Sequence, residues 1–167
     1  MNKTLAGLGI TALSVALTGT AAPAQAADGT ERVTVHYNSN VEGRSLAVAH
    51  GPITGVGWMT AEPIVQDAAV VTLDFRSGKV TMRATITSEV LLGIDFTTCK
   101  ASVDVAGRWT VISGTGAYVG AEGSGEFGAL RHISGDRVAG QCQGPDSGRE
   151  PRQVREILHF TGGVTLP

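Results

Sequence analysis

Apolar side chains occupy every second position of residues 79–87, KVTMRATIT, from Val80 to Ile86. A period of two places them on one face of an extended strand, with the threonines and the arginine between them on the other. Residues 71–75 alternate in the same way, and the intervening Arg-Ser-Gly at 76–78 is a short link suited to a hairpin. The pattern predicts two antiparallel strands with one buried face.

The same period recurs along much of the chain, at residues 33–37, 101–105 and 108–112. The nearest approach to an amphipathic helix is the segment 149–160, which Pro151 and mixed faces weaken. Many short strands with glycine-rich turns predict an all-β sandwich or a closed barrel. No linker or change in composition divides the chain, so we expect one domain.

The first 26 residues have the organisation of a secretory signal peptide. Lys3 precedes an apolar run from Leu5 to Leu17, and Ala24-Gln25-Ala26 has the small-residue pattern of a cleavage site. The run is shorter than the roughly 20 residues of a membrane-spanning helix. We therefore expect cleavage near Ala26, export without a membrane span, and a β domain over residues 27–167.

Charge and composition narrow the range of partners. Removing the leader from the 167 residues leaves 141, with 12 basic against 15 acidic side chains. A mildly acidic surface cannot gather phosphates, so we expect no nucleic-acid partner. Aromatic residues make up 5% of the chain, which disfavours a platform for stacking bases. Nothing in the sequence indicates a cofactor.

The chain has two cysteines, Cys99 and Cys142, and both follow the predicted leader. Export would place them in an oxidising environment. A pair in a secreted domain most simply forms one disulfide. The alternative, a reactive thiol, needs an activating neighbour, and Lys100 is the only adjacent cation. We favour the disulfide.

Residues 112–128, ISGTGAYVGAEGSGEFG, end in a literal G-x-G-x-x-G. A dinucleotide-binding fingerprint needs a buried strand before the glycines and a helix after them. The preceding residues are polar and broken by glycine, and residues 129–135 are too short for that helix. We interpret the glycines as a turn followed by a sharply curved strand, anchored by Tyr118 and Phe127.

Residues 109–127 also resemble the GTG-x-Y/F-x-G-A-x-G signature of allene oxide cyclase-like and dirigent-like β-barrels. Residues 49–57 resemble the G-P-I-x-G-x-G strand of small secreted bacterial relatives of that barrel, and residues 160–167 resemble their closing strand. The resemblance covers most of 49–167 and leaves 30–48 unassigned. It implies a single eight-stranded antiparallel β-barrel.

The resemblance supplies no catalytic residue, because no motif here matches the acidic and polar residues of those barrels. The four histidines, at positions 36, 50, 132 and 159, lack the spacing of a metal site, so we expect no metal. The Asp-Ser-Gly at 146–148 resembles the surroundings of a protease nucleophile, but we interpret 144–151 as an exposed loop.

Two glutamates, Glu122 and Glu126, are weak acid/base candidates. Four residues apart on a strand, they would share one face, and burial in a lumen would raise their pKa values. Phe127 would then point outward, so we favour a solvated face for both.

Three functions remain open, in order of preference. The first is a secreted barrel that binds a small apolar ligand in its lumen, since eight strands leave room for one small molecule. The second is an interaction protein with a filled core, which includes a homo-oligomer. The third is a cyclase, isomerase or dirigent-like enzyme. The candidate lumen residues are Phe75, Val80, Met82, Ile86 and Trp109.

Overall fold

The computed structural model describes residues 27–40, 43–143 and 150–167. The predicted signal peptide and residues 144–149 of the predicted loop lie outside these residues. The described chain is all-β apart from one short 3-10 turn, η1 (Gly116–Tyr118). The strands are β1 (Ala27–Asn38), β2 (Ser45–His50), β3 (Gly55–Ala61), β4 (Ala68–Phe75), β5 (Gly78–Asp95), β6 (Lys100–Gly114), β7 (Glu122–Ser134), β8 (Arg137–Val138), β9 (Gln141–Cys142) and β10 (Gln153–Leu166).

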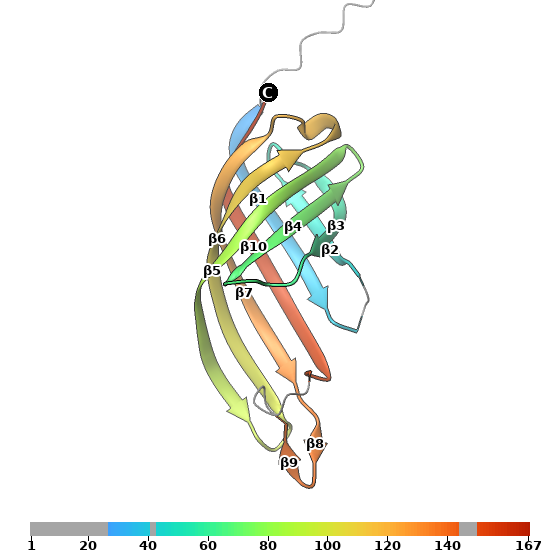
Figure 1. Cartoon of the computed structure of the whole chain (residues 1–167). Coiled ribbons are helices and arrows are strands. Elements are labelled where there is room, and N and C mark those ends of the chain that lie inside the picture. Colours follow the sequence, from blue (N-terminus) through green and yellow to red (C-terminus); the bar gives the residue numbers. More distant parts are fainter. Residues whose placement is uncertain (1–26, 41–42, 144–149) are drawn as a thin grey trace, which may run out of the picture.

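Eight of these strands form one closed antiparallel ring in the order β1-β10-β7-β6-β5-β4-β3-β2. Strands β1 and β2 pair with each other, which leaves no gap in the ring (Figure 1). The small β8–β9 hairpin forms a separate sheet below it. An all-β fold in a single ring agrees with the alternation along the sequence.

The structure confirms the predicted hairpin of residues 71–87 as β4 and β5, and merges the two runs at 101–105 and 108–112 into β6. Of the segment 149–160, residues 153–160 belong to strand β10 and not to a helix. The expectation that 49–57 is a strand is wrong, because residues 51–54 turn the chain between β2 and β3.

In the glycine-rich stretch 112–128, the structure confirms the predicted turn followed by a strand. Gly116 starts the 3-10 turn at a φ of 62°, which favours glycine, and residues 123–128 lie inside the antiparallel strand β7. Tyr118 and Phe127, the predicted anchors, are both buried. The G-x-G-x-x-G residues therefore have neither the helix nor the parallel sheet of a dinucleotide site.

Large aromatic side chains pack inside the barrel, and three of them, Trp109, Phe75 and Phe127, each lie on a glycine of another strand. The indole of Trp109 lies on Gly162, where a Cβ atom would come within 2.6 Å of the ring. Its Nε1 donates to the carbonyl oxygens of Glu126 and Thr161, at 3.1 and 3.2 Å. The buried indole is thus fully hydrogen-bonded as well as closely packed.

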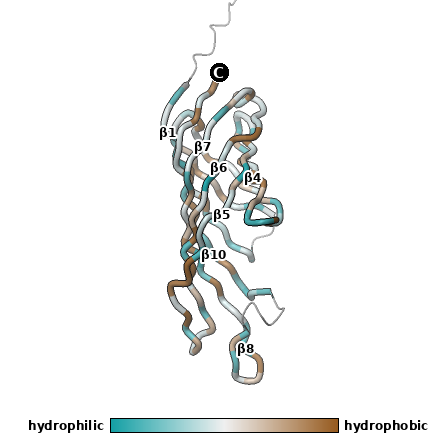
Figure 2. Tube along the Cα trace, turned by 60° about the vertical axis from the view of Figure 1, so that its left-hand side comes forward, coloured by the Kyte–Doolittle hydropathy of each residue, from teal (hydrophilic) through white to brown (hydrophobic). Residues whose placement is uncertain are grey.

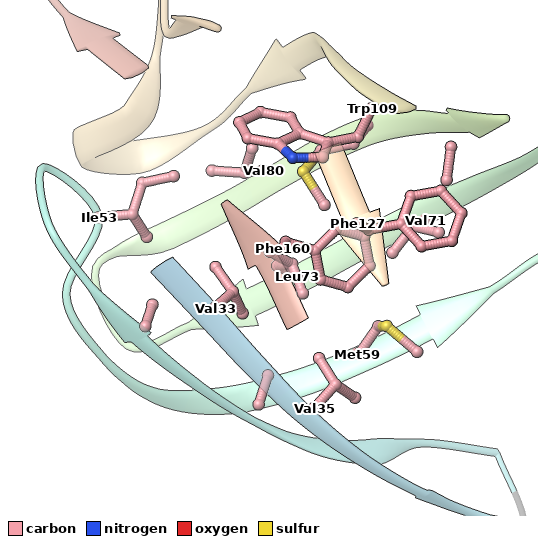
Figure 3. Packing of buried hydrophobic residues seen from close by; sticks show 14 of the residues in the cluster. Val33, Val35, Ile53, Met59, Val71, Leu73, Val80, Trp109, Phe127 and Phe160 are labelled. Atoms are coloured by element: carbon pink, nitrogen blue, oxygen red, sulfur yellow. The ribbon is translucent and has the colours of Figure 1, made fainter. Parts of the chain in front are cut away.

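Two further pairs repeat this arrangement. The ring of Phe75 lies over Gly57, and the ring of Phe127 lies over Gly107, its partner in the β6–β7 ladder. We call the part of the barrel around Trp109 the closed half. Its interior is packed with buried apolar side chains, of which Figure 3 labels Val33, Ile53, Leu73, Val80 and Trp109. The same cluster includes Phe75, Met82, Tyr118 and Val164.

A buried carboxylate, Glu31, fastens the turn that covers this closed half. Glu31 is 1% exposed, and its Oε2 accepts the backbone N–H of Ile53 at 2.8 Å. Gly51 adopts a φ of 146° beside it, and a Cβ there would lie 2.6 Å from the carbonyl oxygen of Thr30. Burial raises the pKa of Glu31 to about 7, against the lowering effect of the Ile53 N–H.

Beyond the ring, β5 and β6 continue as a long hairpin. β4 pairs with β5 only as far as Thr85, so among the described strands residues 88–95 of β5 have β6 as their one neighbour. A disulfide between Cys99 and Cys142 joins the hairpin turn to β9, as the sequence predicted. Arg137 of β8 also donates to the carbonyl oxygens of this turn. These contacts fix the small β8–β9 sheet to the hairpin.

The glycine packing predicts opposite effects at two adjacent positions of β10. Gly162→Ala would place a methyl group against Trp109 and the backbone of Ser124, whereas a Cβ at Gly163 meets nothing within 4 Å. We expect the first substitution to lower the free energy of unfolding by more than about 2 kcal/mol, and the second to change it by under about 1 kcal/mol. Urea unfolding of both variants measures this, and equal stabilities would contradict the packing role.

The raised pKa of Glu31 predicts a pH-dependent stability. The folded protein holds this proton up to about pH 7, whereas the unfolded chain releases it near 4.5, so stability falls as pH rises between these values and is constant above them. Between pH 5 and 8 the wild type should lose about 2 kcal/mol more than Glu31→Gln.

Urea unfolding at both pH values measures that difference, with Glu126→Gln as an exposed control that should keep the wild-type profile. Parallel profiles of the wild type and Glu31→Gln would refute the assignment to Glu31.

Candidate functional site

The other half of the barrel, which we call the open half, contains a cavity of about 700 Å³. Its floor is the ring pair Phe127 and Phe160, whose centroids lie 5.5 Å apart. Its wall adds Val71, Ala84 and Val105, all buried. The volume falls within the roughly 300–1,000 Å³ of small-molecule sites, and the lining is mainly apolar as in such sites.

A pair of small side chains makes room for the cavity. Ala69 of β4 and Ala84 of β5 are opposite each other in the ladder and both line the cavity. Ile86, two positions further along β5, lines it as well. In the closed half the same two strands carry the larger Leu73, Phe75, Val80 and Met82 on their inner faces. The lumen is therefore filled or hollow according to side-chain size.

One wall of the cavity carries a row of charged groups. Arg131 of β7 contacts Glu89 of β5 with an Nη1–Oε1 distance of 3.0 Å, and Glu156 of β10 with an Nη2–Oε1 distance of 3.3 Å. The side chains of Arg131 and Glu156 are 22% and 9% exposed. Arg131 and Glu156 line the cavity, and Glu156 is directly opposite Arg131 in the β7–β10 ladder.

Glu156 is the half-buried ionisable group beside the cavity. Burial raises its pKa, Arg131 lowers it by charge and hydrogen bonding, and the charge of Glu89 raises it again. The net shift is upward. A carboxyl group in this position can hold or release a proton next to a bound molecule, or pair with a positive charge on it.

Three more charged residues, Arg44, Glu62 and Asp67, line the cavity. The Arg44 guanidinium also lies 4.9 Å from the ring centroid of Trp58, a distance typical of a cation–π contact. The mouth of the cavity therefore has both signs of charge around an apolar interior.

The structure separates the five predicted lumen residues. Ile86 lines the cavity, whereas Phe75, Val80, Met82 and Trp109 are buried in the closed half. All five face the interior or pack against its core, but four of them occupy space that a ligand would need.

The two predicted acid/base candidates lie on the outside of the barrel. Glu122 and Glu126 are exposed, and Phe127 between β6 and β10 points inward instead. The residues with this chemistry beside the cavity are Glu156 and Arg131, which the sequence interpretation missed. The signal was available in residues 154–160, where a glutamate occupies the inner position of an otherwise apolar alternation.

The remaining sequence features lie away from the cavity. All four histidines are exposed, and no cluster of three potential metal ligands occurs among the described residues. A second hollow, of about 680 Å³, lies between residues 110–114 and 120–124 over the glycine-rich stretch. Its one charged side chain is Glu122, which would repel a phosphate.

Comparisons with known proteins identify no relative of this chain. No protein-family model matches the chain, and neither a curated protein nor a solved structure matches it. Within the described residues, no helix has the length and apolar character needed to cross a membrane.

Proposed function

We propose that the protein is a secreted barrel that binds a small, mainly apolar molecule in the open half of its lumen. The observation that carries this proposal is the cavity of about 700 Å³ above the Phe127–Phe160 floor. The disulfide supports export to an oxidising environment. The resemblance of residues 109–127 to allene oxide cyclase-like and dirigent-like barrels supports the same role.

The apolar lining explains what such a molecule would gain on binding. Each Å² of apolar surface removed from water contributes roughly 25 cal/mol. The interior also presents buried wall residues from β4, β5 and β6, whose backbones are held by the closed ring. A rigid apolar site binds without a large ordering cost, which favours affinity.

The alanine pair predicts a substitution that fills the site. Ala69→Phe would place a phenyl ring in the cavity, and Val70→Phe is a matched control because residue 70 faces the other side of β4. We expect the neutral apolar dye Nile red to bind the wild type and Val70→Phe equally. Ala69→Phe should weaken binding at least about tenfold, a change of roughly 1.4 kcal/mol.

Fluorescence titration gives the dissociation constants, and circular dichroism confirms that both variants fold. Equal binding by Ala69→Phe and Val70→Phe would place the dye outside the cavity and reject the proposal.

A second candidate function is association between two copies of the chain through the β5–β6 hairpin. Five large apolar residues on or next to the end of β5 are 49% to 71% exposed, and Figure 2 shows an apolar stretch near the lower end of the molecule. In the part of the chain that the structure describes, residues 88–95 also lack a second neighbouring strand, and an open apolar edge is a template for pairing. The five residues are Val90, Leu91, Leu92, Ile94 and Phe96.

This candidate predicts a dimer that depends on the hairpin. Light scattering coupled to size exclusion should give the mass of two chains for the wild type, and of one chain for Leu92→Lys/Ile94→Lys. Val119→Lys removes an equally exposed apolar residue outside the hairpin and should remain dimeric. A wild type that elutes as a single chain over all concentrations would reject the candidate.

A further inference from the structure

The charges around the open half do not balance. The positive charges around the cavity are Arg44 and Arg131. The negative charges are four carboxyl groups: Glu62, Asp67 and Glu156 in the cavity lining, and Glu89 bound to Arg131. Two positive and four negative groups leave a formal charge of −2 with all of them ionised. Protonation of Glu156 would still leave an excess negative charge.

Arg131 is already occupied by carboxylates on both sides. Glu89 and Glu156 approach its two terminal nitrogens at 3.0 and 3.3 Å. An anionic ligand would have to compete with these partners, or approach Glu156 and be repelled by it. The row of Glu89, Arg131 and Glu156 is thus poorly suited to bind a carboxylate or a phosphate.

A positively charged group on a ligand, in contrast, would stabilise the ionised carboxyl group of Glu156. Its side chain is only 9% exposed, and Arg131 is shared between it and Glu89. A second cation beside the carboxyl group would favour its ionised form and offset the cost of burial. A neutral group could donate one hydrogen bond there but could not balance the charge.

An aromatic residue is paired with Glu156 across the sheet. Tyr37 of β1 is opposite Glu156 in the β1–β10 ladder and lines the same cavity. The face of a tyrosine ring attracts cations, most strongly where water is partly excluded. A carboxylate and an aromatic ring at one level of the wall form a suitable environment for an organic cation.

We propose that the molecule bound in the open half carries one cationic head group, a protonated amine or guanidine, on an apolar body. Its head group pairs with Glu156 beside Tyr37, and its body lies on the Phe127–Phe160 floor. This inference rests on the proposed function, because it assigns the head group of a ligand in the same cavity.

Three ligands of equal chain length test the head group. Decylamine, decanol and decanoate, each below the concentration at which it forms micelles, are titrated at neutral pH against the wild type loaded with Nile red. We expect decylamine to displace the dye at a concentration at least about tenfold lower than decanol, and decanoate to be the weakest.

The variant Glu156→Gln keeps the side-chain shape and removes the charge. Its affinity for decylamine should fall about tenfold, while its affinity for decanol should stay within about twofold. Glu126→Gln is the matched control, because it removes one negative charge from the exposed outer face of the barrel. This control should retain the preference for the amine.

The outcomes separate the two proposals. Equal displacement by decylamine and decanol in the wild type, or tighter binding of decanoate, would overturn the cationic head group while leaving the binding function intact. A preference for the amine that survives in Glu156→Gln would also overturn it. Failure of the wild type to bind Nile red and all three ligands would reject the binding function itself.

Discussion

The contact of aromatic rings with glycines on other strands determines where this barrel is solid and where it is hollow. A ring the size of an indole fits inside eight strands only if the opposing positions have no side chain. Gly162 meets that need for Trp109, Gly57 for Phe75 and Gly107 for Phe127. Two glycines of the 109–127 signature allow close packing of strands, because a Cβ at Gly123 or Gly125 of β7 would lie no more than 2.5 Å from a carbonyl oxygen of β10.

The cavity is the complement of this packing. The filled part of the lumen contains Trp109 and Phe75, and the rings of Phe127 and Phe160 form its boundary with the cavity. On the cavity side of these rings, the inner positions of β4 and β5 include Ala69 and Ala84. Strands β1, β4, β5, β6 and β10 contribute side chains to both halves. A lumen built in this way can acquire or lose a cavity through a few changes in side-chain size, without a change of fold.

The sequence predicted which side chains face inward but not how far along the lumen each one lies. Alternation identified Val80, Met82 and Ile86 as one face, which is a local property of a strand. Whether a given level of the barrel is filled depends on what the other seven strands present there, and those contacts are long-range. Of that face, Ala84 and Ile86 border the cavity, whereas Val80 and Met82 are packed in the closed half. The β5–β6 hairpin was also beyond prediction, since its apolar residues have the same composition as buried strands.

Two glutamates with raised pKa values show how the two halves differ in chemistry. Glu31 is sealed beneath the turn of residues 51–54, and the N–H of Ile53 occupies its Oε2, so it contributes to the closure of the barrel. Glu156 is shifted in the same direction by burial, but it borders a cavity and shares its one arginine with Glu89. Desolvation alone therefore does not identify a functional carboxyl group. What distinguishes Glu156 is that it lines the cavity, so that a molecule entering the lumen can reach it.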